Sequence, residues 1–229
     1  MSLSIEFSSP LKGLIPEPKP STHFISQTYK KLSDEVEYTP TVKKCIPFRD
    51  ALLTGYILPI PVDYRFRYDF ENKRALFEMN PNLPPIIQEK LNMGFHPNSQ
   101  LSDEMHDSLR TVDAVFKFMN QWVVKTPPGY SCFFTQPFNR NLPFKIIDAV
   151  VDTDNFFSSV KLPFYWRAPV KETLILESGS PMCLVIPFKR ENWKMKINFK
   201  KEKIENRVNF FRKFWDNYKT HSWSKKTYK

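Results

Sequence analysis

Four turn signals divide residues 126–190 into short apolar runs. They are Thr126-Pro127-Pro128-Gly129-Tyr130, Gln136-Pro137-Phe138-Asn139-Arg140, Val150-Val151-Asp152-Thr153-Asp154 and Glu177-Ser178-Gly179-Ser180-Pro181. The runs of Phe, Val, Ile and Leu between them have lengths that suit strands. The pattern predicts a single antiparallel β-unit, with strands over residues 130–135, 145–151, 160–166, 173–176 and 182–188. Such regular turn spacing is typical of a sandwich or a barrel.

The segments before this block predict one hairpin and two short helices. Aromatic and charged residues alternate over residues 64–70, and an apolar run over residues 75–79 returns beside them, which indicates a hairpin. Residues 47–53 and 85–93 are expected to be helical, because proline suits the first turn of a helix and glycine the position after its end.

Three further segments give less specific signals. The apolar run of residues 56–61 carries two prolines, which places it at a sheet edge. Residues 115–125 are expected to form one strand. Residues 101–112 are ambiguous, since Ser102 could cap a helix whose apolar positions are Met105, Leu109 and Val112.

The composition limits the class of protein. The chain has 229 residues, 41% hydrophobic and 15% aromatic, so one domain with a sizeable core is expected. Its 5 glycines form no phosphate-cradling motif. The 3 cysteines, Cys45, Cys132 and Cys183, lie far apart, which argues against a zinc site and a disulfide framework. Because no signal-peptide pattern and no apolar run of ~18 residues occur, we expect a cytoplasmic protein that is not secreted and has no membrane span.

Three regions are expected along the chain. Residues 1–40 are interpreted as an extended Pro-rich arm, either disordered or pinned across a neighbouring subunit. Residues 41–190 are the β-rich core, and residues 191–229 are a basic helix and tail packed on it. From residue 190 onward the chain has 13 Lys and Arg against 4 Asp and Glu, so this end carries nearly all of the net charge of +10.

The basic end contains an amphipathic pattern. Apolar residues recur at every third or fourth position, which predicts a helix with a buried stripe of Ile204, Val208, Phe211, Trp215 and Tyr218. Lys203, Arg207 and Lys213 lie mostly outside that stripe. They are candidates for weak nucleic-acid binding without sequence preference, and a solvated helix face is the alternative.

Acidic residues gather around the third turn signal. Asp152 and Asp154 could bind Mg²⁺ beside a substrate phosphate, with Asp148 close by. Alternatively, the loop of Asp152 and Asp154 caps a turn through its own backbone. Arg140 could clamp a phosphate or pair with Asp148 or Asp152 in a structural salt bridge.

A second group of polar residues precedes the β-block. His96, His106, Asp103 and Asp107 contain the residue types of a two-histidine, one-carboxylate iron site. His106 and Asp107 are adjacent, so on a strand they would face opposite sides. This spacing argues against the iron site.

The layout of residues 126–190 resembles the β-clip core of trimeric dUTPases and dCTP deaminases. The stretch Pro128-Gly129-Tyr130 is similar to the first motif of that family, and Val150-Val151-Asp152-Thr153-Asp154 to its Val-Ile-Asp-x-Asp-Tyr motif. Residues 136–140 take the place of its Pro-Arg-Ser loop, and residues 178–186 that of its Gly-Asp-Arg-Ile-Ala-Gln segment. The resemblance implies a trimer and places Asp152 at the water-activating carboxylate, which makes it the best catalytic candidate.

Four contact residues of that family are replaced in this chain. Phe138 or Asn139 stands near the phosphate-contacting serine, and Asn155 stands at the uracil-stacking tyrosine. Pro181 and Leu184 replace the arginine and the glutamine of the last segment. The candidates for binding a ligand or a phosphate are Asn139, Arg140 and Asp154. The replacement of the four contact residues favours a protein without the family's activity.

The whole chain also resembles an uncharacterised family of phages and bacteria. The resemblance is carried by Cys45-Ile46-Pro47-Phe48, Gly55-Tyr56-Ile57, residues 125–131 and Pro187-Phe188-Lys189-Arg190 with Trp193-Lys194. It implies a phage setting, in the cytoplasm of an infected bacterial cell or in the virion.

Two functions follow from these patterns. The first is a non-catalytic β-clip-like binding or assembly protein of a phage programme, which forms a homo-oligomer or binds other phage proteins. The alternative is a nucleotide-binding enzyme, phosphohydrolase or deaminase-like, with altered active-site residues. No cofactor is expected, except Mg²⁺ in the case of the alternative.

Overall fold

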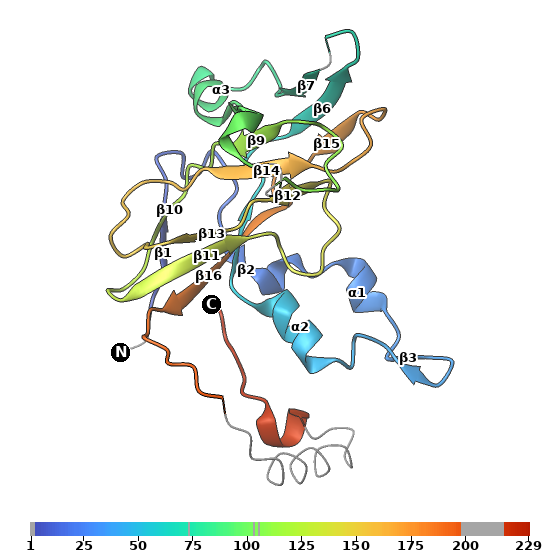
Figure 1. The fold of residues 1–229 in the computed structure, drawn as a ribbon, viewed down its shortest axis with the longest axis vertical. Coiled ribbons are helices and arrows are strands. Elements are labelled where there is room, and N and C mark those ends of the chain that lie inside the picture. The colour runs from blue at the N-terminus through green and yellow to red at the C-terminus, as the bar shows by residue number, and fades with distance from the viewer. Residues whose placement is uncertain (1–2, 73, 103, 105, 198–217) are drawn as a thin grey trace.

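The computed structural model describes residues 3–72, 74–102, 104, 106–197 and 218–229. The fold is mainly antiparallel β with short helices, as the sequence predicts. Figure 1 shows the five-stranded sheet near the middle of the molecule, with two of the smaller sheets above it and short helices below it.

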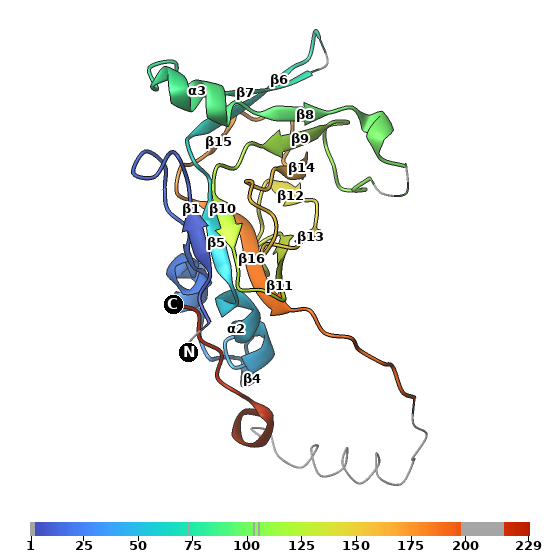
Figure 2. The ribbon, with the colours of Figure 1, turned by 90° about the vertical axis from the view of Figure 1, so that its left-hand side faces the viewer.

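The largest sheet has the strand order β13-β11-β16-β5-β2. These strands are Ala149–Val151, Tyr130–Thr135, Pro181–Lys189, Tyr56–Pro59 and Lys19–Pro20. Every neighbouring pair is antiparallel. Figure 2 shows β5 and β16 side by side along the middle of the molecule.

Two further sheets share the aromatic core above it. The first has the order β12-β14-β9-β8, with strands Phe144–Ile146, Leu162–Trp166, Val115–Phe118 and Gly94–His96. The second has the order β15-β6-β7, with strands Leu174–Leu176, Tyr64–Asp69 and Arg74–Glu78. The hairpin expected over residues 64–79 is thus confirmed.

The remaining elements are small. Strand β1 (Glu6–Ser8) pairs with β10 (Val123–Lys125), and β3 (Glu35–Val36) pairs with β4 (Thr39–Pro40). The α-helices are α1 (Gln27–Lys31), α2 (Ile46–Leu53) and α3 (Pro85–Leu91), and the last two confirm the predicted helices. Single turns are formed by Ser21–Phe24, Asn98–Gln100 and Tyr218–Ser222.

Stacked aromatic rings fill the space between the two upper sheets. The ring centroids of Phe66 and Trp166 lie 4.1 Å apart, and those of Phe118 and Phe164 lie 4.2 Å apart, both nearly parallel. Phe77 reaches from β7 to within 5.0 Å of the Phe116 ring on β9. Because aromatic pairs gain energy beyond their buried area, this layer holds the sheets together.

The β-block does not form one sheet, contrary to the sequence prediction. Its strands belong to three sheets, because they pair with earlier segments of the chain: β16 with β5, β14 with β9, and β15 with β6. The predicted strand over residues 145–151 divides into β12 and β13, which belong to different sheets. Asp148 stands at this crossing, where its carboxylate accepts a hydrogen bond from Thr135 Oγ1 at 2.5 Å.

Residues 115–125 also form two strands instead of the predicted one. The buried side chain of Asn120 closes a turn between them, accepting from Trp122 N at 3.0 Å and donating to Trp122 O at 2.9 Å. After this turn β10 pairs with β1 and no longer with the sheet of β9. A side chain that bonds its own backbone in this way competes with a continuing strand.

The edge position expected for residues 56–61 is wrong. Strand β5 lies between β16 and β2, although it ends in proline. Strand β2 pairs only with Tyr56 and Ile57, so Pro59 lies beyond the hydrogen bonds on that side. A proline is tolerated where no backbone N–H is needed.

The N-terminal segment packs on its own chain. Leu11 and Ile15 are 3% and 5% exposed within the core, and the indole Nε1 of Trp122 donates to Pro16 O at 3.2 Å. This contact differs from the free or neighbour-bound arm that the prolines suggested. No α-helix occurs among the described residues of 101–112, and Thr111 instead bonds the backbone of Trp166 and Ala168.

Candidate functional site

A network of charged and polar groups lies at one end of β11, β13 and β16. The carboxylate of Asp152 accepts a hydrogen bond from Ser131 Oγ at 2.6 Å and lies 3.2 Å from Arg190 Nη1. The carboxylate of Asp154 pairs with Arg190 Nη2 and accepts a hydrogen bond from Gly129 N at 2.8 Å. One arginine therefore joins the two acids that the sequence singled out.

Backbone contacts fix this network to the sheet. Arg190 N donates to Gly129 O at 2.9 Å, and Arg190 Nη1 donates to Tyr130 O at 3.1 Å. Below it, the buried hydroxyl groups of Thr126 and Thr153 lie 2.7 Å apart. The loop of Asp152 and Asp154 is thus tied to the first residues of β11 from two sides.

The charge of Asp154 is stabilised in this network. The hydrogen bond from Arg190 lowers the pKa of Asp154 to about 2, with a further contribution from the Gly129 backbone amide. A carboxylate with so low a pKa is a weak proton acceptor at neutral pH. The network of Asp152, Asp154 and Arg190, called the latch below, therefore suits a structural tie better than a general base.

The three acids of the sequence hypothesis do not converge. Asp148 lies at the other end of β13, where it contacts Thr135 and, at 3.6 Å, Lys145 Nζ. Within the part of the chain that the structure describes, no group of three or more His, Cys, Asp or Glu residues could hold a metal ion. The weak metal candidates Asp152 and Asp154 face the guanidinium of Arg190 instead.

Arg140 does not form the salt bridge to Asp148 or Asp152 that the sequence left open, while its role as a phosphate clamp stays a prediction. Its Nη1 donates to the carbonyl oxygen of Phe24, and no ion pair with Asp148 or Asp152 occurs among the described residues. Burial lowers the pKa of Arg140, and its Nη2 is buried without a hydrogen-bond partner in the described structure. The side chain therefore fastens the loop to the segment before α1.

A cavity of about 620 Å³ nevertheless brings two predicted ligand residues together. It is lined by Asn139 and Arg140, with Lys145 and Asp148 and the aromatic side chains of Phe133 and Phe138. Asn139 has a φ of 53°, in the left-handed region that asparagine tolerates. Asp152 and Asp154 lie outside this cavity.

Among the described residues, His96 and His106 do not gather with an acid into a group that could hold a metal ion. The Nδ1 atom of His96 lies 2.6 Å from Gln100 Oε1, while the His106 ring packs against Tyr165. Asp107 forms an ion pair with Arg167 at 2.5 Å, which lowers the pKa of that carboxyl. Asp103 lies outside the described residues.

The C-terminal predictions are only partly covered by the structure. Lys203, Arg207 and Lys213, with the stripe from Ile204 to Trp215, lie outside the described residues. Tyr218 is 44% exposed, unlike the buried position expected for it. The last residues return to α2, where Asp50 Oδ2 accepts hydrogen bonds from Trp223 Nε1 at 2.8 Å and Lys226 Nζ at 2.7 Å.

Sequence reasoning missed one feature, the segment of residues 191–197. It follows the latch and leaves the sheet as an extended chain, visible in Figure 2 as the orange trace that leads away from the body. Trp193 and Met195 are 86% exposed, and Ile197 is 67% exposed. These side chains alternate with Lys194 and Lys196, a period of two that could have indicated an amphipathic strand.

No protein-family model and no curated protein matches the chain. Among the residues that the structure covers, no helix is both long enough and apolar enough to cross a membrane.

Proposed function

We propose that this protein is a non-catalytic assembly protein that forms a homo-oligomer through residues 191–197. The observation that carries the proposal is the exposure of Trp193, Met195 and Ile197, which alternate along an extended segment and so share one face of it when it pairs as a strand. Soluble proteins expose single apolar residues freely, but contiguous apolar surface marks an interaction site. The basic face of Lys194 and Lys196 keeps the other side of the segment in water.

The energy of such an interface can be bounded. Burying one large apolar side chain contributes ~1.5–3 kcal/mol, so the three together contribute roughly 5 kcal/mol or more per strand. The segment also lacks secondary-structure hydrogen bonds in the described structure. Pairing with another strand would satisfy those backbone groups, which is the basis of recognition by strand addition.

The receiving surface that fits best is the outer edge of β13 in a second copy. β13 ends the five-stranded sheet, and its Val150 is 63% exposed. Phe188 on β16, 38% exposed, continues the apolar surface on the same sheet. Asp148 and Asp152 flank β13 and are already paired with Lys145 and Arg190 of their own chain. The open edge of β13 beside the exposed Val150 therefore favours strand addition from a second copy of the chain.

The contacts of the candidate acids support the non-catalytic part of the proposal. Asp152 is engaged by Ser131 and Arg190, and Asp154 has a pKa of about 2. Both acids therefore hold the end of β16, from which the assembly segment leaves. The phage setting, and a trimer as the form of the oligomer, rest on the sequence resemblance and complete the proposal.

The molar mass in solution tests the proposal. We expect the intact chain to elute with a mass that is a multiple of 27.2 kDa in size-exclusion chromatography with light scattering. Replacing Trp193, Met195 and Ile197 by serine should weaken association at least about 100-fold. The matched control replaces Asn192, Lys194 and Lys196 by serine and should retain the oligomer, while Val150→Ser should weaken it from the receiving side.

A wild-type chain that stays at 27.2 kDa at high concentration would overturn the proposal. An oligomer that survives the three apolar replacements would show that another surface holds it.

A second function, nucleotide binding, is favoured by the cavity around Arg140. Two cations and two aromatic rings line that cavity, which are the groups that hold phosphates and bases. A thermal-shift panel of nucleotides with Mg²⁺ tests it, because a ligand at 100 times its Kd adds ~2.7 kcal/mol to stability. Release of pyrophosphate from dUTP or ammonia from dCTP, abolished by Asp152→Asn, would establish the enzyme instead of the assembly protein.

A further inference from the structure

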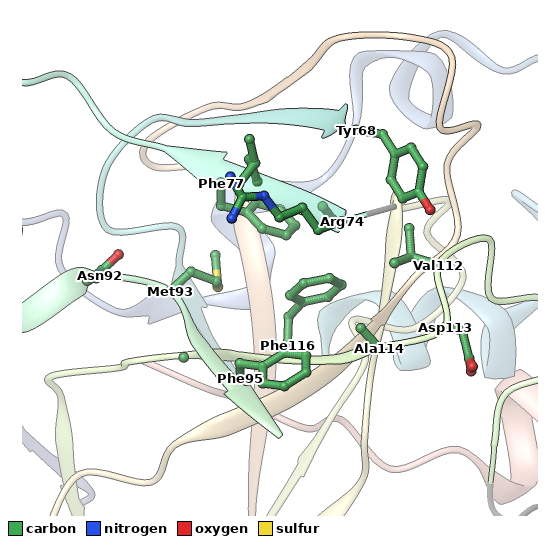
Figure 3. A pocket seen from close by; sticks show the side chains of 13 residues that line it. Tyr68, Arg74, Phe77, Asn92, Met93, Phe95, Val112, Asp113, Ala114 and Phe116 are labelled. Atoms are coloured by element: carbon green, nitrogen blue, oxygen red, sulfur yellow. The ribbon is translucent and has the colours of Figure 1, made fainter. Parts of the chain in front are cut away.

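A cavity lies between the edge strands β7 and β8, which are distant along the chain from residues 191–197. Its volume is about 680 Å³, within the range of small-molecule sites. Figure 3 shows side chains from both strands and from residues 112–116 around it. Its apolar lining consists mainly of Tyr68, Leu76, Phe77, Met93, Phe95 and Phe116.

The cavity is the unfilled end of the aromatic layer between two sheets. Phe77 of one sheet and Phe116 of the other meet at 5.0 Å, and Phe116 lies 6.5 Å from Phe95. Phe95 is 61% exposed, so the row of rings reaches solvent here. A flat apolar body could enter as one more member of this row, since aromatic rings prefer tilted or offset contacts at such distances.

One charged group, Arg74, gives the cavity a preference for anionic ligands. In Figure 3 the side chain of Arg74 runs along β7 toward Phe77 and Met93. Asp69 is its one ion-pair partner among the described residues, 3.6 Å from Arg74 Nε. That carboxylate already accepts hydrogen bonds from Asn72 N at 3.1 Å and Asn72 Nδ2 at 2.8 Å. The terminal nitrogens of Arg74 are thus available to a ligand.

The acid at the opposite rim does not cancel this charge. Asp113 accepts hydrogen bonds from Arg110 Nε at 3.2 Å and Arg110 Nη2 at 3.1 Å, so its charge is compensated by a partner outside the cavity. Figure 3 shows Asp113 pointing away from the aromatic rings. The charged group that a ligand meets in the cavity is therefore the Arg74 guanidinium, which recognises carboxylate, sulfonate or phosphate oxygens in bidentate fashion.

We infer that this cavity binds a small organic anion with a flat, ring-containing apolar body. The rings of Phe77, Phe95 and Phe116 take the body, and Arg74 takes the acid group at the mouth. The site lies on other strands than β13 and residues 191–197, so the inference does not depend on the proposed assembly function. Charge complementarity separates this ligand from a neutral apolar one, which would not need Arg74.

Two fluorescent probes of similar size test the inference on the full chain. One is the aromatic sulfonate 1-anilinonaphthalene-8-sulfonate, and the other is neutral N-phenyl-1-naphthylamine. We expect the sulfonate to bind one site per chain and to be displaced by 2-naphthoate. Arg74→Gln should weaken sulfonate binding about tenfold and change binding of the neutral probe less than about twofold, because a charge-assisted hydrogen bond is lost.

Matched variants show where the probes bind. Arg65→Gln removes the same charge from neighbouring β6, outside this cavity, and should leave both affinities unchanged. Ala114→Leu places three further carbon atoms at the cavity wall and should weaken both probes, with thermal melting as the check that the variant is folded. Equal effects of Arg74→Gln and Arg65→Gln would overturn the inference. So would unchanged binding in a folded Ala114→Leu variant, or displacement by an acidic peptide but not by 2-naphthoate.

Discussion

Gly55 makes the sharpest test of the fold, because it joins α2 to the central strand β5. Its φ is +71°, and a Cβ atom added there would lie 2.4 Å from the carbonyl oxygen of Val185 in β16. Gly179 has a similar φ of +82°, but a Cβ atom there would meet nothing within 4 Å. The two glycines therefore share a backbone conformation and differ in the space around them.

The two alanine variants should differ in stability by about 2 kcal/mol. Alanine in the left-handed region costs ~1–2 kcal/mol, which the reduced freedom of the unfolded chain offsets by ~0.4–1 kcal/mol. Gly179→Ala should therefore cost about 1 kcal/mol. Gly55→Ala adds the displacement of a buried strand, and overpacking of this kind costs ~1–3 kcal/mol.

Urea unfolding followed by circular dichroism measures both free energies of unfolding, and a 2 kcal/mol difference should separate the midpoints by roughly 1 M. Gly129→Ala, with a φ of +84° and an open surrounding, is the second control and should behave like Gly179→Ala. Equal destabilisation of all three variants would refute the close approach of β5 to β16.

Three further results are expected from single positions. Phe164→Ala should cost ~3–5 kcal/mol of unfolding free energy in the same assay, because the buried ring contacts four other aromatic rings and its loss leaves a cavity; a cost below 1 kcal/mol would contradict the packing. The pKa of Asp154 is lowered in the folded chain to about 2, so its contribution to stability is present above the unfolded value of ~3.9 and is lost as the pH falls toward 2. The wild type should therefore exceed Asp154→Asn in stability at pH 6 and lose this advantage near pH 2, and a constant difference would disprove the latch. A thiol reagent at pH 8 should modify exposed Cys45 quickly and the buried Cys132 and Cys183 slowly. Burial raises the pKa of Cys132 to about 11 and also raises that of Cys183, so both thiols stay protonated. All three should react in denaturant, and quick modification of all three in the native chain would contradict the burial of Cys132 and Cys183.

Local structure could be predicted from the sequence because its causes are local. The alternation over residues 64–70 and the turn residues around residues 126–190 placed most strands within two residues of their positions. The division into sheets could not be predicted, since it depends on partners distant in the chain. A proline in an apolar run also predicts an edge strand. Pro59 nevertheless ends a central strand, because the partner strand β2 is too short to reach it.

The candidate site shows the same limit. The closeness of Asp152 and Asp154 follows from the sequence, but Arg190 lies 36 residues beyond Asp154. Only the pairing of Tyr130 with Lys189 at the ends of β11 and β16 brings that arginine to the acids. In the same way, Arg140 approaches Phe24 through the packing of the N-terminal segment, which no pattern around Arg140 indicates.

Amide hydrogen exchange of residues 191–197 at two protein concentrations tests the assembly proposal most directly. In a dilute solution of separate chains these amides should exchange at the rate of an unstructured peptide, because the segment lies extended and exposed. At concentrations where the mass shows an oligomer, the same amides and those of β13 should be protected at least about 100-fold. An oligomer in which residues 191–197 exchange as fast as in the separate chain would contradict the account.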